Sequence, residues 1–435
     1  MLACVAAERG FRAIVGSRIH MHRAVARLPR GIYLAKDVRR PSLRVFRILR
    51  RLGHAIVACD EEGLIFITPA LFHRRRVHAD ALAMAELHLA WGAKGGELVR
   101  TAPGYAGVPI LETGNPRTDL LRAELRGFYA PDIAALRARH GDFIMVNSNF
   151  GRINHFNPEL SLSPHAASAA ERGTLEPDEL PMEAWRFRAD VMAAMLAMLP
   201  ALARAFPERR VVVRPHPAEN HGKWRAAAQG LSNIEVVHQG TIAPWLMAAG
   251  CIVHNGCTTG VEGRLVGAPV VAYRPVTSPD YEVALPNEVG VTATDRDGLV
   301  ATVRALADGP RPLPLSTAER ATLGPYFAAL DGPLAADRMV DALADFAGRR
   351  PLAAPTAIDY LRGAGDATLR AFGKRLNALR PGHKDSAAFT RQRFPGVDPA
   401  QARERIARFG LLLGRFDGLS TRRITDNVFE IERAD

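Results

Sequence analysis

Long hydrophobic runs are missing from this sequence. Its 435 residues include no stretch of about 18 consecutive apolar residues, the length that a membrane-spanning helix requires. The first residues, Met1 to Gly10, also lack the basic flank, long apolar core and small-residue cleavage site of a secretory signal. These absences argue against a membrane-spanning or secreted protein, and we expect a cytoplasmic location.

Cysteine is scarce as well. The spacing of the four cysteines matches no metal-binding motif, and each lies in or beside an apolar segment: Cys4, Cys59, Cys251 and Cys257. Because a chain of this length can form a large core without disulfides, we expect reduced thiols. A phosphate loop of the form GxxxxGK followed by Ser or Thr is also missing, so ATP hydrolysis has no support. We expect neither a metal nor a cofactor.

Acidic residues are fewer than basic ones. The chain has 57 Lys and Arg against 45 Asp and Glu, which gives a net charge of +12 and a sequence pI near 10.1. Nucleic-acid binding is one interpretation, but the basic residues are spread along the chain and no nucleic-acid-binding motif accompanies them. We favour attraction to the anionic inner face of the cytoplasmic membrane or to a phosphate-bearing substrate.

What the sequence does contain is an alternation of short apolar runs and amphipathic helices. The segment 42–52, for example, places apolar residues at helical spacing among arginines. This alternation predicts α/β domains with parallel sheets. The predicted strands are Ile32–Ala35, Ala55–Cys59, Leu87–Trp91, Ile110–Thr113, Phe143–Val146, Val211–Val213, Ile234–Val237, Cys251–His254, Val270–Tyr273 and Val289–Thr292.

The rhythm breaks between residues 151 and 181, where four prolines and scattered polar residues indicate a loop over a cleft or an interdomain crossing. We therefore predict two Rossmann-like domains, 1–165 and 182–348, and a helical extension, 349–435, that packs back on the first domain. Residues 424–431 are interpreted as a closing strand or a tail. Because the chain opens on a helical pattern instead of a strand, we expect a natural start further upstream or an unusual amino end.

Asp60, Glu61, Glu62 and Gly63 follow a predicted strand and form an acidic turn. Crowded carboxylates repel one another, so we expect at least one of them to have a raised pKa and to accept a proton near neutral pH. The alternative is a solvated acidic turn that caps a helix.

His216 lies between two prolines, which restrict the backbone around it. With Arg214 nearby, a protonated imidazole at this strand end would bind a departing phosphate and donate a proton to it. The alternative is a structural histidine at the end of a strand.

Thr258 and Thr259 lie at a predicted helix start, after Asn255 and Gly256. Free N–H groups and hydroxyls at such a start bind phosphate. Ordinary N-capping would explain one threonine well and the pair less well. Glu262, one turn further on, would bind a ribose or serve the capping of the same helix.

Polar loops follow several other predicted strands. Asn115 and Arg117, and likewise Asn147 and Asn149, are expected on the cleft side of the first domain, although Asn-rich turns need no function. The loop that contains Gly240 is our candidate for the pocket of a nucleotide base, on its position alone. A further acidic triplet, Asp-Arg-Asp at residues 295–297, resembles a metal-binding motif but is more simply a helix cap.

Five segments carry a resemblance to a known family. They are 34–63, TGNPRTDLL at 113–121, VNSNFGRINH at 146–155, RPHP at 214–217 and HNGCTTGVE at 254–262. In these segments the chain resembles the bacterial surface carbohydrate biosynthesis family of glycosyltransferases. The resemblance implies the GT-B architecture, in which two Rossmann-like domains face each other across a cleft.

In related sialic acid and Kdo transferases, a short acidic motif supplies the base or nucleophile, and His-Pro and paired Ser/Thr motifs bind the phosphate of CMP. Glu61-Glu62-Gly63, His216-Pro217 and Thr258-Thr259 match these motifs in order. The resemblance therefore implies transfer of a nonulosonic acid or Kdo-like sugar from CMP to a surface glycan or lipid-linked glycan. The alternatives are a polyol-phosphate or UDP-sugar transferase on the same fold, and a non-catalytic scaffold in glycan assembly.

Overall fold

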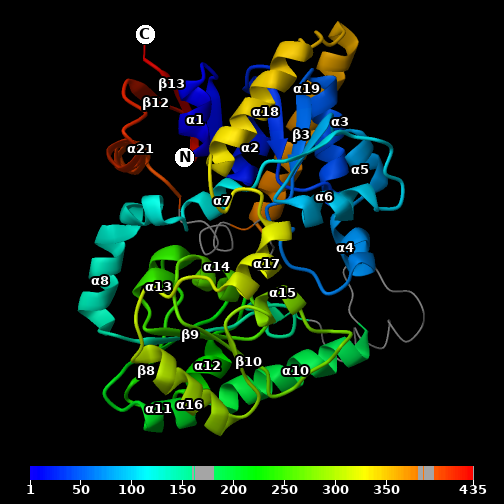
Figure 1. Ribbon diagram of the computed structural model, residues 1–435. Coiled ribbons are helices and arrows are strands. Elements are labelled where there is room, and N and C mark those ends of the chain that lie inside the picture. Colours follow the sequence, from blue (N-terminus) through cyan, green and yellow to red (C-terminus); the bar gives the residue numbers. More distant parts are fainter. Residues whose placement is uncertain (159–160, 162–180, 381–385, 387–395, 435) are drawn as a thin grey trace. The chain divides into compact units, whose positions relative to one another are not determined.

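The computed structural model of the protein describes residues 1–158, 161, 181–380, 386 and 396–434. The chain folds into two compact units (Figure 1). Unit 1 comprises Met1–Leu64, Phe72–Leu120 and the chain from Gly324 onward, and unit 2 comprises Ile65–Leu71 and Leu121–Leu323. Most of the predicted loop between residues 151 and 181 lies outside the described residues. No described helix has the length and apolar character needed to cross a membrane.

Unit 1 is built on a parallel sheet with the strand order β2-β3-β4-β5. Its strands are β2 (Ile32–Ala35), β3 (Ala55–Cys59), β4 (Leu87–Ala90) and β5 (Ile110–Glu112). Its helices include α1 (Leu2–Glu8), α2 (Arg18–Ala24), α3 (Leu43–Arg51), α5 (Ala79–Ala83), α6 (Ala93–Arg100), α7 (Pro116–Asp119), α18 (Ala335–Arg349), α19 (Ala357–Ala378) and α21 (Pro399–Leu413). Helix α4 (Pro69–Arg76) begins in unit 2 and ends in unit 1.

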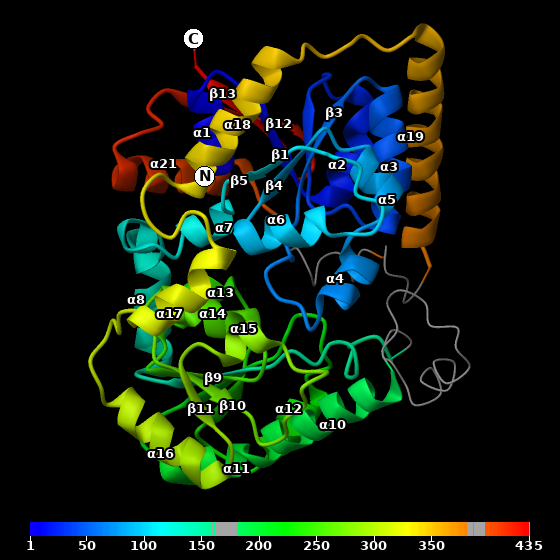
Figure 2. The same cartoon turned by 45° about the vertical axis from the view of Figure 1, so that its right-hand side comes forward.

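The central strand β3 shows why this sheet is covered on both faces. Its side chains alternate, so that Ile56 and Ala58 pack with the apolar stripe of α3, whereas Val57 and Cys59 pack with α18. Helix α19 lies alongside α2 and α3 on the first of these faces (Figure 2). The described residues after 349 thus belong to unit 1.

The carboxyl-terminal extension is not purely helical. It ends in a hairpin of β12 (Leu419–Thr425) and β13 (Val428–Arg433), and β13 also pairs antiparallel with β1 (Ala13–Gly16) near the other end of the chain. Strand β1 therefore lies in this small antiparallel sheet and not in the parallel sheet of unit 1. The segment 424–431, predicted as a closing strand or a tail, contains the end of β12, the turn of the hairpin and the first residues of β13.

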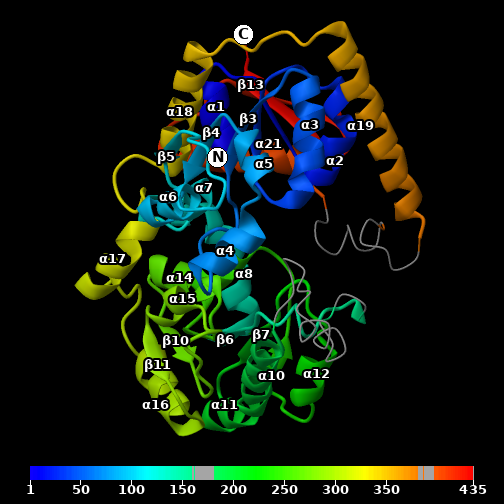
Figure 3. The ribbon, with the colours of Figure 1, turned by 90° about the vertical axis from the view of Figure 1, so that its right-hand side faces the viewer.

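Unit 2 contains a parallel sheet with the order β11-β10-β9-β6-β7-β8. Its strands are β6 (Ile144–Asn147), β7 (Val211–Arg214), β8 (Ile234–Val236), β9 (Cys251–His254), β10 (Val270–Tyr273) and β11 (Val291–Ala293). Its helices include α8 (Ala130–His140), α10 (Met182–Ala197), α11 (Leu199–Ala205), α12 (Gly222–Ala227), α13 (Ile242–Ala248), α14 (Thr258–Leu265), α15 (Ala284–Asn287), α16 (Arg296–Ala307) and α17 (Thr317–Leu323). Apolar residues of α10 and α11 pack against β6 and β7 (Figure 3).

The position of β6 corrects the predicted domain boundary at residue 165. We assigned this strand to the first domain, but it pairs with β7 and β9 in the middle of the second sheet. A short buried apolar run shows that a strand is present without showing which sheet it joins. Asn147, the last residue of β6, and Asn149, in the loop that follows, consequently belong to unit 2.

Together the two units confirm the predicted α/β fold with two Rossmann-like parallel sheets. Numbered along unit 2, the strand order reads 3-2-1-4-5-6, and the direction of winding reverses between β6 and β9. In open α/β sheets, ligands bind beyond the carboxyl ends of the strands at this reversal. The carboxyl ends of β6 and β9 are therefore the first place to look for a ligand site.

Candidate active site

The acidic turn follows β3 at the carboxyl edge of the unit 1 sheet. Asp60 is buried and accepts hydrogen bonds from Nε of Arg76, at 2.9 Å, and from its Nη2. Nη1 of the same arginine donates to Oε2 of Glu62 at 3.1 Å. Gly63 ends the turn. A side chain would not fit there, because an added Cβ would lie 2.9 Å from Cγ of Asp60. The sequence analysis did not identify Arg76, since it ends a basic helix that looks like a solvated surface.

Glu62 contradicts the expectation of a raised pKa. Its partial burial opposes ionisation, but Lys36 and Arg76 outweigh this effect and lower its pKa to about 2. Nζ of Lys36 lies 3.5 Å from the Glu62 carboxylate. Glu62 is therefore ionised at neutral pH and is a weak base.

Glu61 is the member of the turn that keeps an uncompensated carboxylate. Its backbone N–H donates to the carbonyl oxygen of Lys36 at 3.1 Å, which fixes the turn beside β2. Its Oε1 accepts a hydrogen bond from Sγ of Cys59 at 3.7 Å, and no cation among the described residues pairs with it. Of the two predicted catalytic glutamates, Glu61 is the one the geometry leaves available for chemistry.

The TGNPRTDLL segment has a structural role that the sequence analysis missed. Oδ1 of Asn115 accepts a hydrogen bond from N–H of Arg117 and caps α7. The fully buried Asp119 accepts hydrogen bonds from N–H of Ala335 and Ala336, at 2.8 and 2.9 Å, and so caps α18. Asn115 is buried, whereas the predicted substrate residue Arg117 is exposed. The capping of α7 explains the presence of Asn115 at this position without a role in substrate binding.

A buried carboxylate organises the switch point of unit 2. Oε1 of Glu219 accepts hydrogen bonds from Oγ of Ser148, N–H of Phe150 and N–H of His216, at 2.7, 3.0 and 3.1 Å. Its Oε2 accepts one from Nε1 of Trp224 at 2.9 Å. Glu219 thus ties the loop after β6 to the loop after β7. In the sequence it is an unremarkable acid in a polar loop, so no local pattern identifies it.

His216 is held in one orientation by its own loop. Its Nδ1 accepts a hydrogen bond from N–H of Ala218 at 3.1 Å, so in the neutral imidazole the proton resides on Nε2. The side chain is exposed at the carboxyl edge of the sheet. The predicted binding of a departing phosphate by His216 stays a prediction.

Arg214 supports the loop that we considered for a nucleotide base. Its guanidinium lies 4.3 Å from the centre of the Trp245 ring. Its Nη1 and Nη2 donate to the carbonyl oxygens of Gln239 and Gly240 at 2.8 and 3.3 Å. Burial lowers the pKa of Arg214 to about 10. Gly240 has a positive φ of 75°. Arg214 is thus hydrogen-bonded to this loop. The sequence analysis had instead predicted a direct contact between Arg214 and the phosphate.

The turn before α14 is fixed by two side-chain contacts. Nδ2 of Asn255 donates to the carbonyl oxygen of Tyr273 at 2.7 Å, and N–H of Gly256 donates to Oδ1 of Asn287 at 2.9 Å. Gly256 has a positive φ of 56°, a conformation that favours glycine. Both predicted residues therefore shape the backbone that leads into the helix.

The alternative explanation, N-capping by a threonine, does not hold. Cys257 is the N-cap residue of α14, and no side chain caps the helix; Thr258 and Thr259 are its first two residues. The hydroxyl of Thr259 is buried and has no hydrogen-bond partner among the described residues. Glu262 is buried within the same helix. The first turn of α14 therefore keeps backbone N–H groups that no side chain caps.

Arg188 of α10 is a cation at this edge that the sequence analysis missed. Its Nη1 donates to the carbonyl oxygen of Asn149 at 3.2 Å, and no carboxylate among the described residues pairs with it. Burial, and after it the charge of Arg152, lower the pKa of Arg188 to about 10, while Cys257 acts in the opposite direction. A partly buried cation without an acidic partner is suited to an anionic ligand. Arg188 was missed because the rest of α10 has the sequence pattern of a core helix.

His254 ends β9 directly beneath α14. It is fully buried, neither ring nitrogen has a hydrogen-bond partner among the described residues, and burial lowers its pKa to about 4. An added Cβ on Gly260 would lie 2.3 Å from Nε2 of His254, so this glycine lets the helix approach the strand. His254 is consequently a neutral packing residue.

This burial predicts acid sensitivity. Since the folded pKa of about 4 lies below the unfolded value of 6.5, the unfolded state binds more protons between these values, and stability falls as pH decreases through them. Protonation of His254 in the unfolded state should lower the free energy of unfolding by about 2 kcal/mol between pH 7 and pH 5. We expect urea unfolding to show a loss of stability over this range that is about 2 kcal/mol smaller in His254→Leu. An equal loss in both proteins would contradict the assignment.

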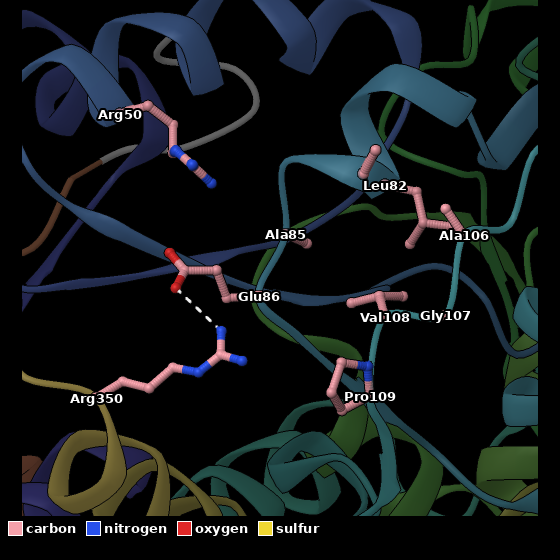
Figure 4. A pocket seen from close by; sticks show the side chains of 10 residues that line it. Arg50, Leu82, Ala85, Glu86, Ala106, Gly107, Val108, Pro109 and Arg350 are labelled. Carbon is pink, nitrogen blue, oxygen red and sulfur yellow. Dashed lines mark ion pairs between the residues drawn. The ribbon is translucent and has the colours of Figure 1, made fainter.

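A separate cavity of about 330 Å³ lies at the other edge of the unit 1 sheet (Figure 4). Its lining includes Glu86 and Pro109, which lead into β4 and β5, and the Glu86 carboxylate pairs with Arg350 at 3.6 Å. It therefore lies at the amino ends of these strands, opposite the acidic turn. None of the predicted site residues lines it.

Comparisons with known proteins give distant structural similarities. No protein-family model and no curated protein matches the sequence. Among solved structures, the chain is similar to UDP-GlcNAc 2-epimerase from Methanocaldococcus jannaschii, with 10% identity, 75% of this chain and 79% of that chain covered, and a TM-score of 0.44. It is also similar to the wall teichoic acid polymerase TagF, with 11% identity, coverage of 76% and 94%, and a TM-score of 0.42. For HepE of Anabaena in complex with UDP-glucose, the identity is 14%, the coverage 73% and 79%, and the TM-score 0.38.

Proposed function

We propose that the protein is a glycosyltransferase that binds a nucleotide-activated sugar at the switch point of unit 2. The observation that carries the proposal is the gathering of anion-binding groups at the carboxyl ends of β6, β7 and β9. These groups are the uncapped first turn of α14, the guanidinium of Arg188 and the Nε2–H of His216. Each is suited to the phosphate of a nucleotide donor.

In the proposed reaction, the acceptor hydroxyl attacks the anomeric carbon of the donor sugar while the bond from that carbon to the phosphate oxygen breaks. The carboxylate of Glu61 takes the hydroxyl proton, and the nucleotide phosphate leaves with the bonding electron pair. His216 and the N–H groups of α14 stabilise the charge on the departing phosphate. No metal or cofactor takes part in this proposal.

The proposed donor is a CMP-activated nonulosonic acid or Kdo-like sugar, and the proposed acceptor is a surface or lipid-linked glycan. The Glu61-Glu62-Gly63, His216-Pro217 and Thr258-Thr259 motifs support this assignment through the family that they resemble. A second candidate donor is a nucleoside diphosphate carrying a sugar or a polyol. The observation that favours it is the proximity of Arg152 to Arg188, because two neighbouring cations suit the larger charge of a diphosphate.

Nucleotide binding tests the proposal directly. We expect CMP to raise the thermal unfolding temperature of the purified protein and Arg188→Met to weaken CMP binding by roughly tenfold or more, since a hydrogen bond to a charged group is worth about 1.5–3 kcal/mol. Titration calorimetry gives both affinities. Arg186→Met is the matched control, because Arg186 is exposed on the same helix.

Three outcomes decide between the candidates. Stabilisation by CMP that is lost in Arg188→Met and kept in Arg186→Met supports the CMP-linked donor. Stronger stabilisation by CDP or UDP than by CMP favours the diphosphate donor. Equal weakening in both variants, or no stabilisation by any nucleotide, contradicts the site.

A further inference from the structure

Helix α19 exposes a row of large apolar side chains. They are 47–80% exposed and lie on one face of the helix, three or four residues apart except across the eight-residue step from Leu361 to Leu369: Ile358, Leu361, Leu369, Phe372, Leu376 and, just beyond the helix, Leu379. Isolated exposed apolar residues are ordinary, but six large ones on a single helix face mark an interaction surface. We call this row the α19 apolar face.

The orientation of the helix is fixed by its opposite face. Gly363 and Ala367 are buried, and α19 packs along α3 there. An added Cβ on Gly363 would lie 2.9 Å from Cβ of Arg51, so the two helices are in close contact. The ion pair between Arg51 and Asp366 closes the same contact. The α19 apolar face, on the opposite side of the helix, therefore points away from the core of unit 1. Figure 2 shows α19 beside α3.

The charged residues of α19 are divided between its two faces. The exposed face carries Arg362 and Arg375 and no acidic residue. Of the two acids in the helix, Asp359 is part of the amino-terminal cap, where it bonds to Thr356, and Asp366 pairs with Arg51. Arg380 follows the helix. The exposed surface thus combines apolar and positively charged side chains.

This combination identifies the occupant. An amphipathic helix with long apolar side chains and flanking arginines is the kind that lies in the plane of a membrane surface containing anionic lipids. A second copy of the chain on the same face would bring Arg362 and Arg375 close to their own equivalents with no acid to pair them. The net charge of +12 adds long-range attraction to a negative surface.

We propose that the α19 apolar face is a docking surface for an anionic lipid bilayer. The apolar side chains enter the boundary between headgroups and acyl chains, and Arg362 and Arg375 lie at the level of the lipid phosphates. The proposal is independent of the proposed function, since it uses no residue of the nucleotide site. Its failure and that of the glycosyltransferase assignment are therefore separable.

Sedimentation of the full chain with vesicles tests this proposal. One set contains phosphatidylcholine alone, and the other contains phosphatidylcholine with phosphatidylglycerol. We expect binding to the anionic vesicles, and a reduction of at least about tenfold in both Leu369→Glu/Phe372→Glu and Arg362→Glu/Arg375→Glu. The matched control is Leu411→Glu/Leu412→Glu, because these exposed leucines lie on α21, outside the proposed surface.

The control should bind as the unchanged protein does, and CMP stabilisation should be the same in all the variants. Lack of binding to anionic vesicles at low salt would overturn the proposal, and so would equal losses in the α19 and α21 variants. The self-association alternative is examined by sedimentation velocity. A dimer that Leu369→Glu/Phe372→Glu converts to a monomer would assign the surface to a second copy of the chain and would also overturn the proposal.

Discussion

Glu61→Gln is expected to reduce the transfer rate by at least about 100-fold while leaving nucleotide affinity unchanged. Glutamine keeps the size of the side chain but cannot accept the proton of an acceptor hydroxyl, and general base catalysis contributes about 100- to 10,000-fold. The pairing of Asp60 and Glu62 with Arg76 leaves Glu61 as the available carboxylate of the turn. Initial rates with labelled donor and calorimetric titration with CMP measure the two effects separately.

Glu62→Gln is the matched control for this prediction. The Glu62 carboxylate has a pKa of about 2 and is paired with Lys36 and Arg76, so it is a weak base. Its side chain is 59% exposed, and exposed ion pairs contribute little to stability. We expect a loss of less than about tenfold. A larger loss in Glu62→Gln than in Glu61→Gln would exchange their roles, and unchanged transfer in both would favour a non-catalytic scaffold.

Glu219→Ala is expected to lower the unfolding free energy of unit 2 by about 3 kcal/mol or more and to weaken nucleotide binding. The Glu219 carboxylate accepts hydrogen bonds from Ser148, Phe150, His216 and Trp224, and alanine would leave these donors without their partner. An unsatisfied buried donor costs about 1–3 kcal/mol, although water entering the space would offset part of this. The loss of order in both loops would also displace His216.

Urea unfolding followed by tryptophan fluorescence measures the stability loss, since Trp224 is fully buried and bonds directly to Glu219. Glu208→Ala is the control, because Glu208 is an exposed acid of the same unit. We expect its stability to change by no more than about 0.5 kcal/mol. If Glu219→Ala is as stable as Glu208→Ala, the buried carboxylate does not organise the switch point.

Much of the secondary structure could be predicted from the sequence. The apolar runs at Ala55–Cys59, Cys251–His254 and Val270–Tyr273 have the same bounds in the structure as in the prediction. These strands are buried on both faces, so they appear as continuous apolar segments ended by glycine or polar residues. The predicted cap at Asp295 is also confirmed, because its Oδ1 accepts a hydrogen bond from N–H of Gly298 at 2.8 Å.

The candidate site was predicted less completely. The loops after β3, β7 and β9 were identified because glycine, proline and polar residues follow each strand directly. Arg76, Arg188 and Glu219 were missed, since each is a charged residue in a helix or polar loop with no distinctive spacing. Their importance comes from partners that are distant in the sequence, such as Asp60 for Arg76 and Ser148 for Glu219.

The sequence by itself determined where strands and helices form and which turns end them, because burial periodicity and backbone preferences act over a few neighbouring residues. Only the tertiary structure decided that β6 lies in the second sheet and that Arg76 neutralises two of the three turn carboxylates. Strand order and charge pairing depend on contacts between segments far apart in the chain. The free energies of those contacts depend on distances and burial that arise only when the chain packs.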